Sequence, residues 1–346
     1  MTNKFKEKYQ ENFLKYREKI WAKNRARVRL HVSFRRSYRE DYDRDLKIPG
    51  LTSHAFRTFR FLFKNWKLFG GLLFLTTLFI ILFVGLMSEE TYTETQEMVD
   101  TAAADLSIGN VGTFAKSGLL LLSTIASAGL SASMTEVQRV FLVLAFLVVW
   151  LVTIYLTRHI LNGEKPKLRD GLYNSLTPLL STLVVFFIAM IQAIPIFIVA
   201  LTYSAAVATD FLATPFYALV YFIFAAAMLL LSAYLLSSTF IALIAVTAPG
   251  LYPMTALHAA SDLVAGRRTR FVIRLIYLIF IIALIAVVIM LPIIFLDLWL
   301  KSWVSWLEGI PIVALFLFMT ICFIFIYATT YLYLFYRSVL DYDYKK

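Results

Sequence analysis

The strongest constraint on this chain is a series of apolar runs, each long enough to cross a lipid bilayer. An α-helix needs about 20 apolar residues to cross a hydrocarbon core of roughly 30 Å. Hydrophobic residues make up 60% of the 346-residue chain, more than a typical soluble domain carries. The runs predict an all-α polytopic transmembrane bundle with six spanning helices, at about 66–87, 140–161, 178–203, 215–246, 271–296 and 310–336.

Charge asymmetry predicts the orientation of this bundle. The first 66 residues contain 18 Lys and Arg against 7 Asp and Glu, a net +11 that equals the charge of the whole chain. Residues 88–138 instead hold seven acids and one lysine. Basic flanks stay on the cytosolic side, so we expect a multi-pass protein of the cell (inner) membrane with both termini cytosolic. The predicted parts are a basic tail (1–65), a membrane domain (66–336) and a cytosolic C-terminal tail (337–346).

The basic tail begins with a pattern typical of an amphipathic helix over residues 4–30, with apolar residues at steps of three and four. Three interpretations stay open: a charged helix packed on cytosolic loops, an interfacial helix on anionic lipid, or a nucleic-acid contact. Nucleic acid is the least favoured, because no base-stacking or groove-reading module accompanies the helix. We therefore expect the bilayer, anionic lipid headgroups at the cytosolic face and a protein partner of the tail as the contacts of this chain.

A second motif precedes the first span, where acids and bases alternate before Pro49-Gly50 breaks the chain. It resembles the juxtamembrane signature (Ser-Phe-Arg, Asp-Tyr-x-Arg, Pro-Gly) of uncharacterised polytopic membrane proteins of Saccharibacteria-type ultrasmall bacteria. That family has no assigned activity, so the resemblance implies a lineage and a topology rather than a chemistry. Leu51 departs from the aromatic residue that often follows the Pro-Gly pair. The candidate partner or lipid contacts are Ser33, Phe34, Arg35, Arg39, Asp41, Tyr42 and Arg44.

Two further segments are predicted at the membrane surface. Residues 51–66 interleave aromatic and basic side chains, which is typical of a lead-in segment at the interface with snorkelling cations. Residues 117–133 are apolar but short and rich in Ser and Gly. If they spanned, two later basic loops would lie outside the cell, so we expect a re-entrant or interfacial element on the external face.

Few polar groups interrupt the predicted spans. Gln192 and Pro195 share the third span, where the proline predicts a kink and the glutamine an interhelical hydrogen bond. The alternative is a broken helix that lines a transport path. Small and hydroxyl residues favour close approach of the fourth span to its neighbours, and Pro292 predicts a kink in the fifth. The candidate intramembrane positions are Gln192, Pro195, Ser237, Ser238 and Pro292.

A weaker similarity concerns the loop between the fourth and fifth spans. Pro253, Ala256-Leu257, Ser261 and Gly266-Arg267 resemble a stretch in the membrane domain of some glycerophosphodiester phosphodiesterases. The resemblance covers about 20 positions, and the catalytic barrel of those enzymes is absent here.

Sequence motifs for catalysis are missing. No nucleophile elbow, Walker loop or zinc-binding His-Glu-x-x-His run occurs, and Cys322 is the lone cysteine. We expect no enzyme activity, cofactor or metal. The favoured interpretation is a membrane scaffold or transport-accessory module whose basic tail docks on anionic lipid or a cytosolic partner. A transporter or channel for an uncharged or lipid-like solute is the alternative, and an enzyme acting on lipids is the third.

Overall fold

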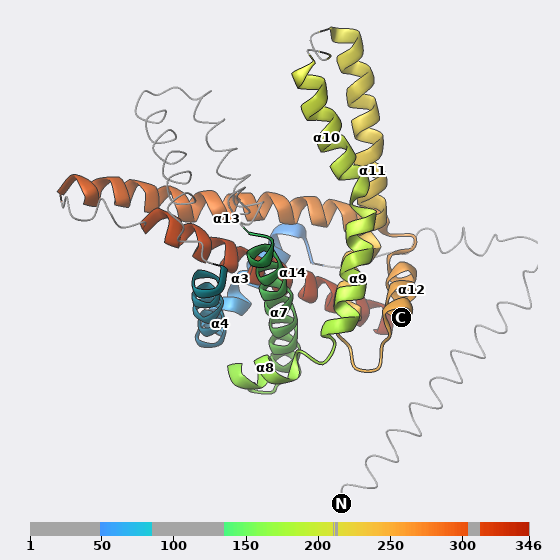
Figure 1. The fold of residues 1–346 in the computed structure, drawn as a ribbon. Helices are drawn as coiled ribbons and strands as arrows, with labels where there is room; N and C mark the ends of the chain where they lie inside the picture. Colours follow the sequence, from blue (N-terminus) through green and yellow to red (C-terminus); the bar gives the residue numbers. More distant parts are fainter. Residues whose placement is uncertain (1–48, 85–134, 210, 212–213, 304–311, 346) are drawn as a thin grey trace, which may run out of the picture. The chain divides into compact units, whose positions relative to one another are not determined.

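The computed structural model describes residues 49–84, 135–209, 211, 214–303 and 312–345. Its long elements in those ranges are all helical, ten α-helices and one π-helix (Figure 1). The all-α prediction is therefore confirmed. Five helices are long and apolar enough to cross a membrane, or six if one bent pair counts as a single span. By length and composition, the described helices are those of a polytopic membrane protein.

The helices follow one another in chain order with short connections between most of them. They are α3 (Leu51–Lys64), α4 (Trp66–Phe79), η2 (Ile80–Val84), α7 (Glu136–Leu161), α8 (Leu168–Asn174), α9 (Leu179–Gln192), α10 (Ile194–Ala208), α11 (Pro215–Ala245), α12 (Pro253–Val264), α13 (Arg268–Trp303) and α14 (Ile312–Lys345). The expected helix over 4–30, the motif of residues 33–44 and the element at 117–133 lie outside the described residues.

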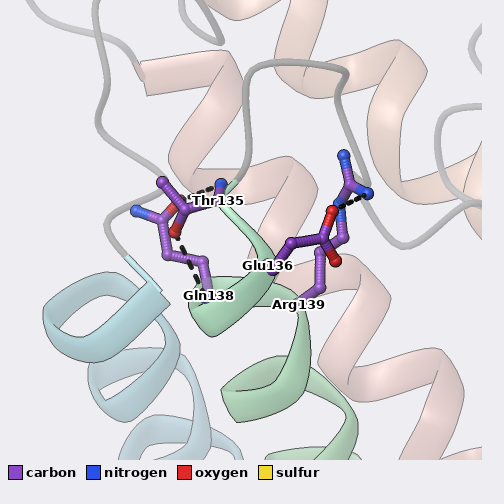
Figure 2. Close-up of polar contacts among 4 residues, drawn as sticks. All are labelled: Thr135, Glu136, Gln138 and Arg139. Carbon is purple, nitrogen blue, oxygen red and sulfur yellow. Dashed lines mark hydrogen bonds and ion pairs between the residues drawn. The ribbon is translucent and has the colours of Figure 1, made fainter.

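Helix α7 begins at a complete capping box, drawn in Figure 2. The Thr135 hydroxyl accepts a hydrogen bond from the backbone N–H of Gln138 at 3.3 Å, and the Gln138 side chain accepts one from the Thr135 N–H at 2.9 Å. Glu136 and Arg139 add an ion pair at 3.0 Å. These polar contacts satisfy N–H groups that a helix start leaves free, which fixes where the apolar span begins.

Helix α14 is the centre of the described packing, with α3, α4, α7, α11 and α13 all against it. Its largest fully buried side chains are aromatic, namely Tyr327, Tyr331 and Phe335. The helix also continues to Lys345, through most of the predicted C-terminal tail. Val339 is fully buried there, and Arg337 pairs with Asp341 at 3.3 Å one turn later. Packing and an i,i+4 ion pair therefore extend the helix beyond the apolar run.

The predicted third span, 178–203, is divided into α9 and α10, which both lie along α11 (Figure 1). Helix α9 ends at Gln192 and α10 starts at Ile194, just before Pro195. Proline lacks an N–H and its ring clashes with the preceding turn, so it interrupts the helix, and the interruption here is a break rather than a kink. The bent pair that could count as one span is instead α8 with α9, at an angle of 73°.

Candidate functional site

The described contact that joins the most distant parts of the sequence is the docking of α3 on α13 and α14. One face of α3 is buried, made of His54, Ala55, Thr58 and Leu62. Positions separated by three and four residues share a helix face, so these four side chains form a single stripe. The stripe packs against α14 and α13. We call this face the inner face of α3.

His54 is the polar centre of the inner face. The ring is fully buried, and its Nε2 lies 3.2 Å from the backbone carbonyl oxygen of Tyr331, 277 residues away along the chain. A carbonyl oxygen only accepts, so Nε2 carries the hydrogen and donates it. The ring also meets Tyr331 edge-on, with ring centroids 4.5 Å apart. His54 therefore fixes both the depth and the rotation of α3 on α14.

The environment of His54 keeps it uncharged. The pKa of His54 lies at about 4, below its usual 6.5, because burial and, to a smaller extent, the nearby Arg274 and Arg57 lower it by more than the hydrogen bond to Tyr331 raises it. Its Nδ1 atom is buried and has no hydrogen-bond partner. A proton there would place a third positive charge beside two guanidinium groups. The imidazole at neutral pH is therefore a structural hydrogen-bond donor.

Arg274 of α13 holds the beginning of α3. Its Nη2 atom donates to the backbone carbonyl of Pro49 at 2.8 Å, and its guanidinium lies 5.0 Å from the Phe335 ring centroid. The Tyr331 hydroxyl is buried beside the same guanidinium without a well-aligned hydrogen bond. Tyr327 adds a hydrogen bond from its hydroxyl to the carbonyl of Ala55 at 3.3 Å. Three helices thus meet in one polar and aromatic contact.

The opposite, outer face of α3 has a different composition. Phe56 and Phe63 are 64% and 67% exposed, and Arg57, Arg60 and Lys64 are exposed beside them. The Arg60 guanidinium lies 5.3 Å from the Phe56 ring centroid. Large exposed aromatic side chains beside cations are typical of a surface that faces a membrane interface or a partner.

Gln192, the first of the candidate intramembrane residues, is hydrogen-bonded to α11. Thr239 of α11 donates to the side-chain oxygen of Gln192, and Ser232 donates to its backbone carbonyl at 2.8 Å. The Gln192 carbonyl is the group that the break before Pro195 leaves free, because the N–H of Ile196 turns to Ala193 instead. Both oxygens of Gln192 are therefore used to join α9 to α11.

The remaining candidates make local contacts. The hydroxyls of Ser237 and Ser238 donate to carbonyls of their own helix, those of Tyr234 at 2.7 Å and Leu235 at 3.0 Å. Pro292 lies inside α13, which runs unbroken from Arg268 to Trp303. Gln192 and Pro195 lie on the two sides of the break between α9 and α10. The hydrogen bonds of the Ser237 and Ser238 hydroxyls stay within α11.

Three side chains that the fold covers are absent from the sequence-predicted site residues: His54 and Asp297, which are buried, and Arg274, which is half-buried. Asp297 is 3% exposed and is the last residue of the apolar stretch of α13. The sequence offered one indication of a polar inner face on α3. His54 follows the Pro49-Gly50 pair by one helical turn, in a stretch of Arg and Phe residues.

The described residues contain no group of three His, Cys, Asp or Glu side chains that could hold a metal ion. No known protein family, curated protein or solved structure matches the chain. Helix α3 packs one face against α13 and α14 and leaves its other face exposed.

Proposed function

We propose that this protein is a non-enzymatic scaffold or transport-accessory module of the cell membrane. Its basic tail docks on anionic lipid or a cytosolic partner through residues in the stretch 33–44. The observation that carries this proposal is the contact of His54 and Pro49 with α14 and α13. That contact anchors the described end of the tail, Pro49 and helix α3, on the bundle.

The arrangement of the basic helix ends supports a cytosolic position for this contact. Arg158, near the end of α7, donates two hydrogen bonds to Thr247 just after α11, at 3.0 Å and 2.7 Å. Arg274 near the start of α13 reaches Pro49 before α3. Two basic residues, Arg158 and Arg274, thus make contacts between helix ends, and the positive-inside bias assigns such ends to the cytosol.

A second contact supports an even number of crossings between α4 and α7. The rings of Phe83 at the end of η2 and Phe141 near the start of α7 lie 6.5 Å apart. The chain therefore leaves α4 and re-enters α7 at neighbouring places. This agrees with an external segment between them that does not change sides, as the interpretation of 117–133 requires.

The contacts of Gln192 bear on the transporter alternative. Both of its oxygens accept hydrogen bonds from α11, which supports a structural role as an interhelical contact. A path-lining glutamine would instead keep its side chain available to a solute.

Cross-linking in cells, followed by mass spectrometry, tests the proposed function. We expect the full chain to capture cytosolic proteins or anionic lipids, and a variant that lacks residues 1–48 to lose them while it still inserts in the membrane. A label on Arg169→Cys should react only from the cytosolic side, and one on Ser131→Cys only from outside. Unchanged cross-links after the deletion, or solute flux in proteoliposomes that Gln192→Leu abolishes, would contradict the scaffold and favour a transporter.

A further inference from the structure

The position of α3 along the membrane normal follows from its connection to α4. Only Asn65 separates Lys64, the last residue of α3, from Trp66, the first residue of the apolar stretch 66–83. The Asn65 side chain donates to the carbonyl of Phe61 at 2.9 Å, which closes the end of α3 within this short link. A helix joined by one residue to the beginning of a span has its C-terminal end at the headgroup level.

The outer face of α3 is divided into two edges. At about 100° per residue, Phe56 and Phe63 lie along one edge, and Arg57 and Lys64 lie along the other. Arg60 lies between the edges, with its guanidinium near the Phe56 ring. Helix α3 contains no Asp or Glu, so no acidic side chain of this helix neutralises its cations. The face therefore combines a net positive charge with two large exposed rings.

The inner face determines which way these edges point. His54 and Thr58 are fully buried, and the Phe59 ring lies 4.6 Å from the Tyr327 ring of α14. Rotation of α3 about its axis would remove the hydrogen bond from His54 to Tyr331. The outer face is thus presented in one fixed orientation rather than averaged over many.

We infer that the outer face of α3 binds anionic phospholipid headgroups. Arg57, Arg60 and Lys64 pair with lipid phosphates, while Phe56 and Phe63 enter the boundary between headgroups and acyl chains. Lipid is favoured over an acidic protein segment because the face continues directly into a membrane span. The inference deepens the proposed function, on which it rests for the side of the membrane, and it concerns α3 rather than residues 33–44.

Electron paramagnetic resonance on the full chain in lipid nanodiscs tests this inference. A nitroxide is attached at Ser53→Cys, an exposed position on the outer face, in a Cys322→Ala background. Collisions with oxygen and with a water-soluble nickel complex report the depth of the label. We expect the label to lie deeper when phosphatidylglycerol is added to phosphatidylcholine, and this shift to be lost in an Arg57→Gln/Arg60→Gln/Lys64→Gln variant and at high salt.

A matched variant controls for loss of charge as such. Lys165→Gln/Lys167→Gln/Arg169→Gln removes three exposed cations from the segment around the start of α8 and should retain the shift. A Phe56→Ser/Phe63→Ser variant should make the label shallower in both lipid mixtures. The depth of a label at Ala259→Cys on α12 should be the same in the unaltered chain and in the α3 variants.

Three outcomes would overturn the inference: equal label depth with and without phosphatidylglycerol, equal loss of the shift in both charge variants, or a shift that disappears when residues 1–48 are deleted. The last outcome would assign lipid binding to residues 1–48 alone. A failed depth shift with intact tail-dependent cross-links would remove the α3 inference and leave the proposed function standing.

Discussion

Helices α14 and α11 are both long and apolar, yet they occupy different environments. Of the 18 consecutive residues that are most apolar in each helix, 67% are buried inside the protein in α14 and 17% in α11. The exposed part of α11 carries Phe216, Leu219 and Phe222, whereas the buried side chains of α14 include Tyr327, Tyr331 and Thr330. Overall hydropathy therefore identifies both helices as spans and does not distinguish the central one.

The interior of α14 contains threonine side chains as well as apolar ones. Thr320, Thr329 and Thr330 each donate to a carbonyl one turn earlier in α14, so their hydroxyls are satisfied inside the protein. In hydrocarbon the same side chains gain nothing from exposure, and Phe or Leu are favoured at positions that face lipid. Among the five candidate spans, the one in α14 is the most buried within the protein.

The largest expected effect comes from a cavity in α14. Ile326→Ala removes a side chain that is 1% exposed, and we expect it to lower the free energy of unfolding by about 2–5 kcal/mol. Ile223→Ala on α11 removes the same atoms from a side chain that is 63% exposed and should cost less than about 1 kcal/mol. Thermal unfolding in detergent compares the two. Equal losses would show that α14 is no more central than α11.

Acid should release α3 from α14. The folded-state pKa of His54, about 4, lies below its usual 6.5, so the undocked state binds the proton more readily. The uncharged His54 stabilises the docked state completely above pH 6.5. This stabilisation decreases as the pH drops toward 4, by up to about 3 kcal/mol. Hydrogen exchange of residues 51–64 between pH 7 and pH 4 measures the release.

The control for this pH dependence uses two substitutions. His54→Leu should remove the dependence while it leaves the ring site filled, and His258→Gln on the exposed side of α12 should leave it unchanged. Exchange of residues 51–64 that does not accelerate toward pH 4 in the unaltered chain would show that His54 is not a buried docking group.

A smaller loss is expected where α7 meets α11. Arg158→Met removes both hydrogen bonds to Thr247 and should lower the free energy of unfolding by about 2 kcal/mol. Arg169→Met, an exposed arginine on α8, should have little effect. Chemical unfolding of the reconstituted protein measures both. Equal free energies of unfolding for the two variants would mean that the contact between Arg158 and Thr247 does not stabilise the protein.

The smallest effect is expected at the contact between α9 and α11. Ser232→Ala removes the donor to the Gln192 carbonyl and should destabilise the protein by about 0.6–1.7 kcal/mol, as interhelical hydrogen bonds in membranes do. Ser237→Ala, whose hydroxyl bonds within its own helix, should cost less. Unfolding measurements on the two variants separate these cases, and a larger loss for Ser237→Ala would contradict the assignment.

Much of the architecture follows from sequence periodicity. Apolar runs predict the helices, and the mixture of Phe56, Arg57 and Arg60 predicts an interfacial segment where α3 lies. Pro195 predicts an interruption, although proline chemistry alone does not decide between a kink and the break at Ala193. That choice depends on Ser232, whose hydroxyl takes up the freed carbonyl 40 residues away.

The docking contact could not be predicted in the same way. The partner of His54 is a backbone carbonyl 277 residues away, and a backbone group leaves no mark in the sequence. Arg274 looks like one more cytosolic cation until its hydrogen bond to Pro49 is known. Asp297 looks interfacial because aromatic residues follow it, although the fold buries it. Local patterns report which face of a helix is apolar, and tertiary contacts decide what covers it.

Photo-cross-linking from the two faces of α3 tests the central claim most directly. A photoreactive phenylalanine at position 59, where the native ring lies 4.6 Å from that of Tyr327, should be captured by the α14 peptide. The same group at position 63, on the exposed outer face, should be captured by lipid. Capture of lipid from position 59, or of α14 from position 63, would contradict the docking of α3 on α14.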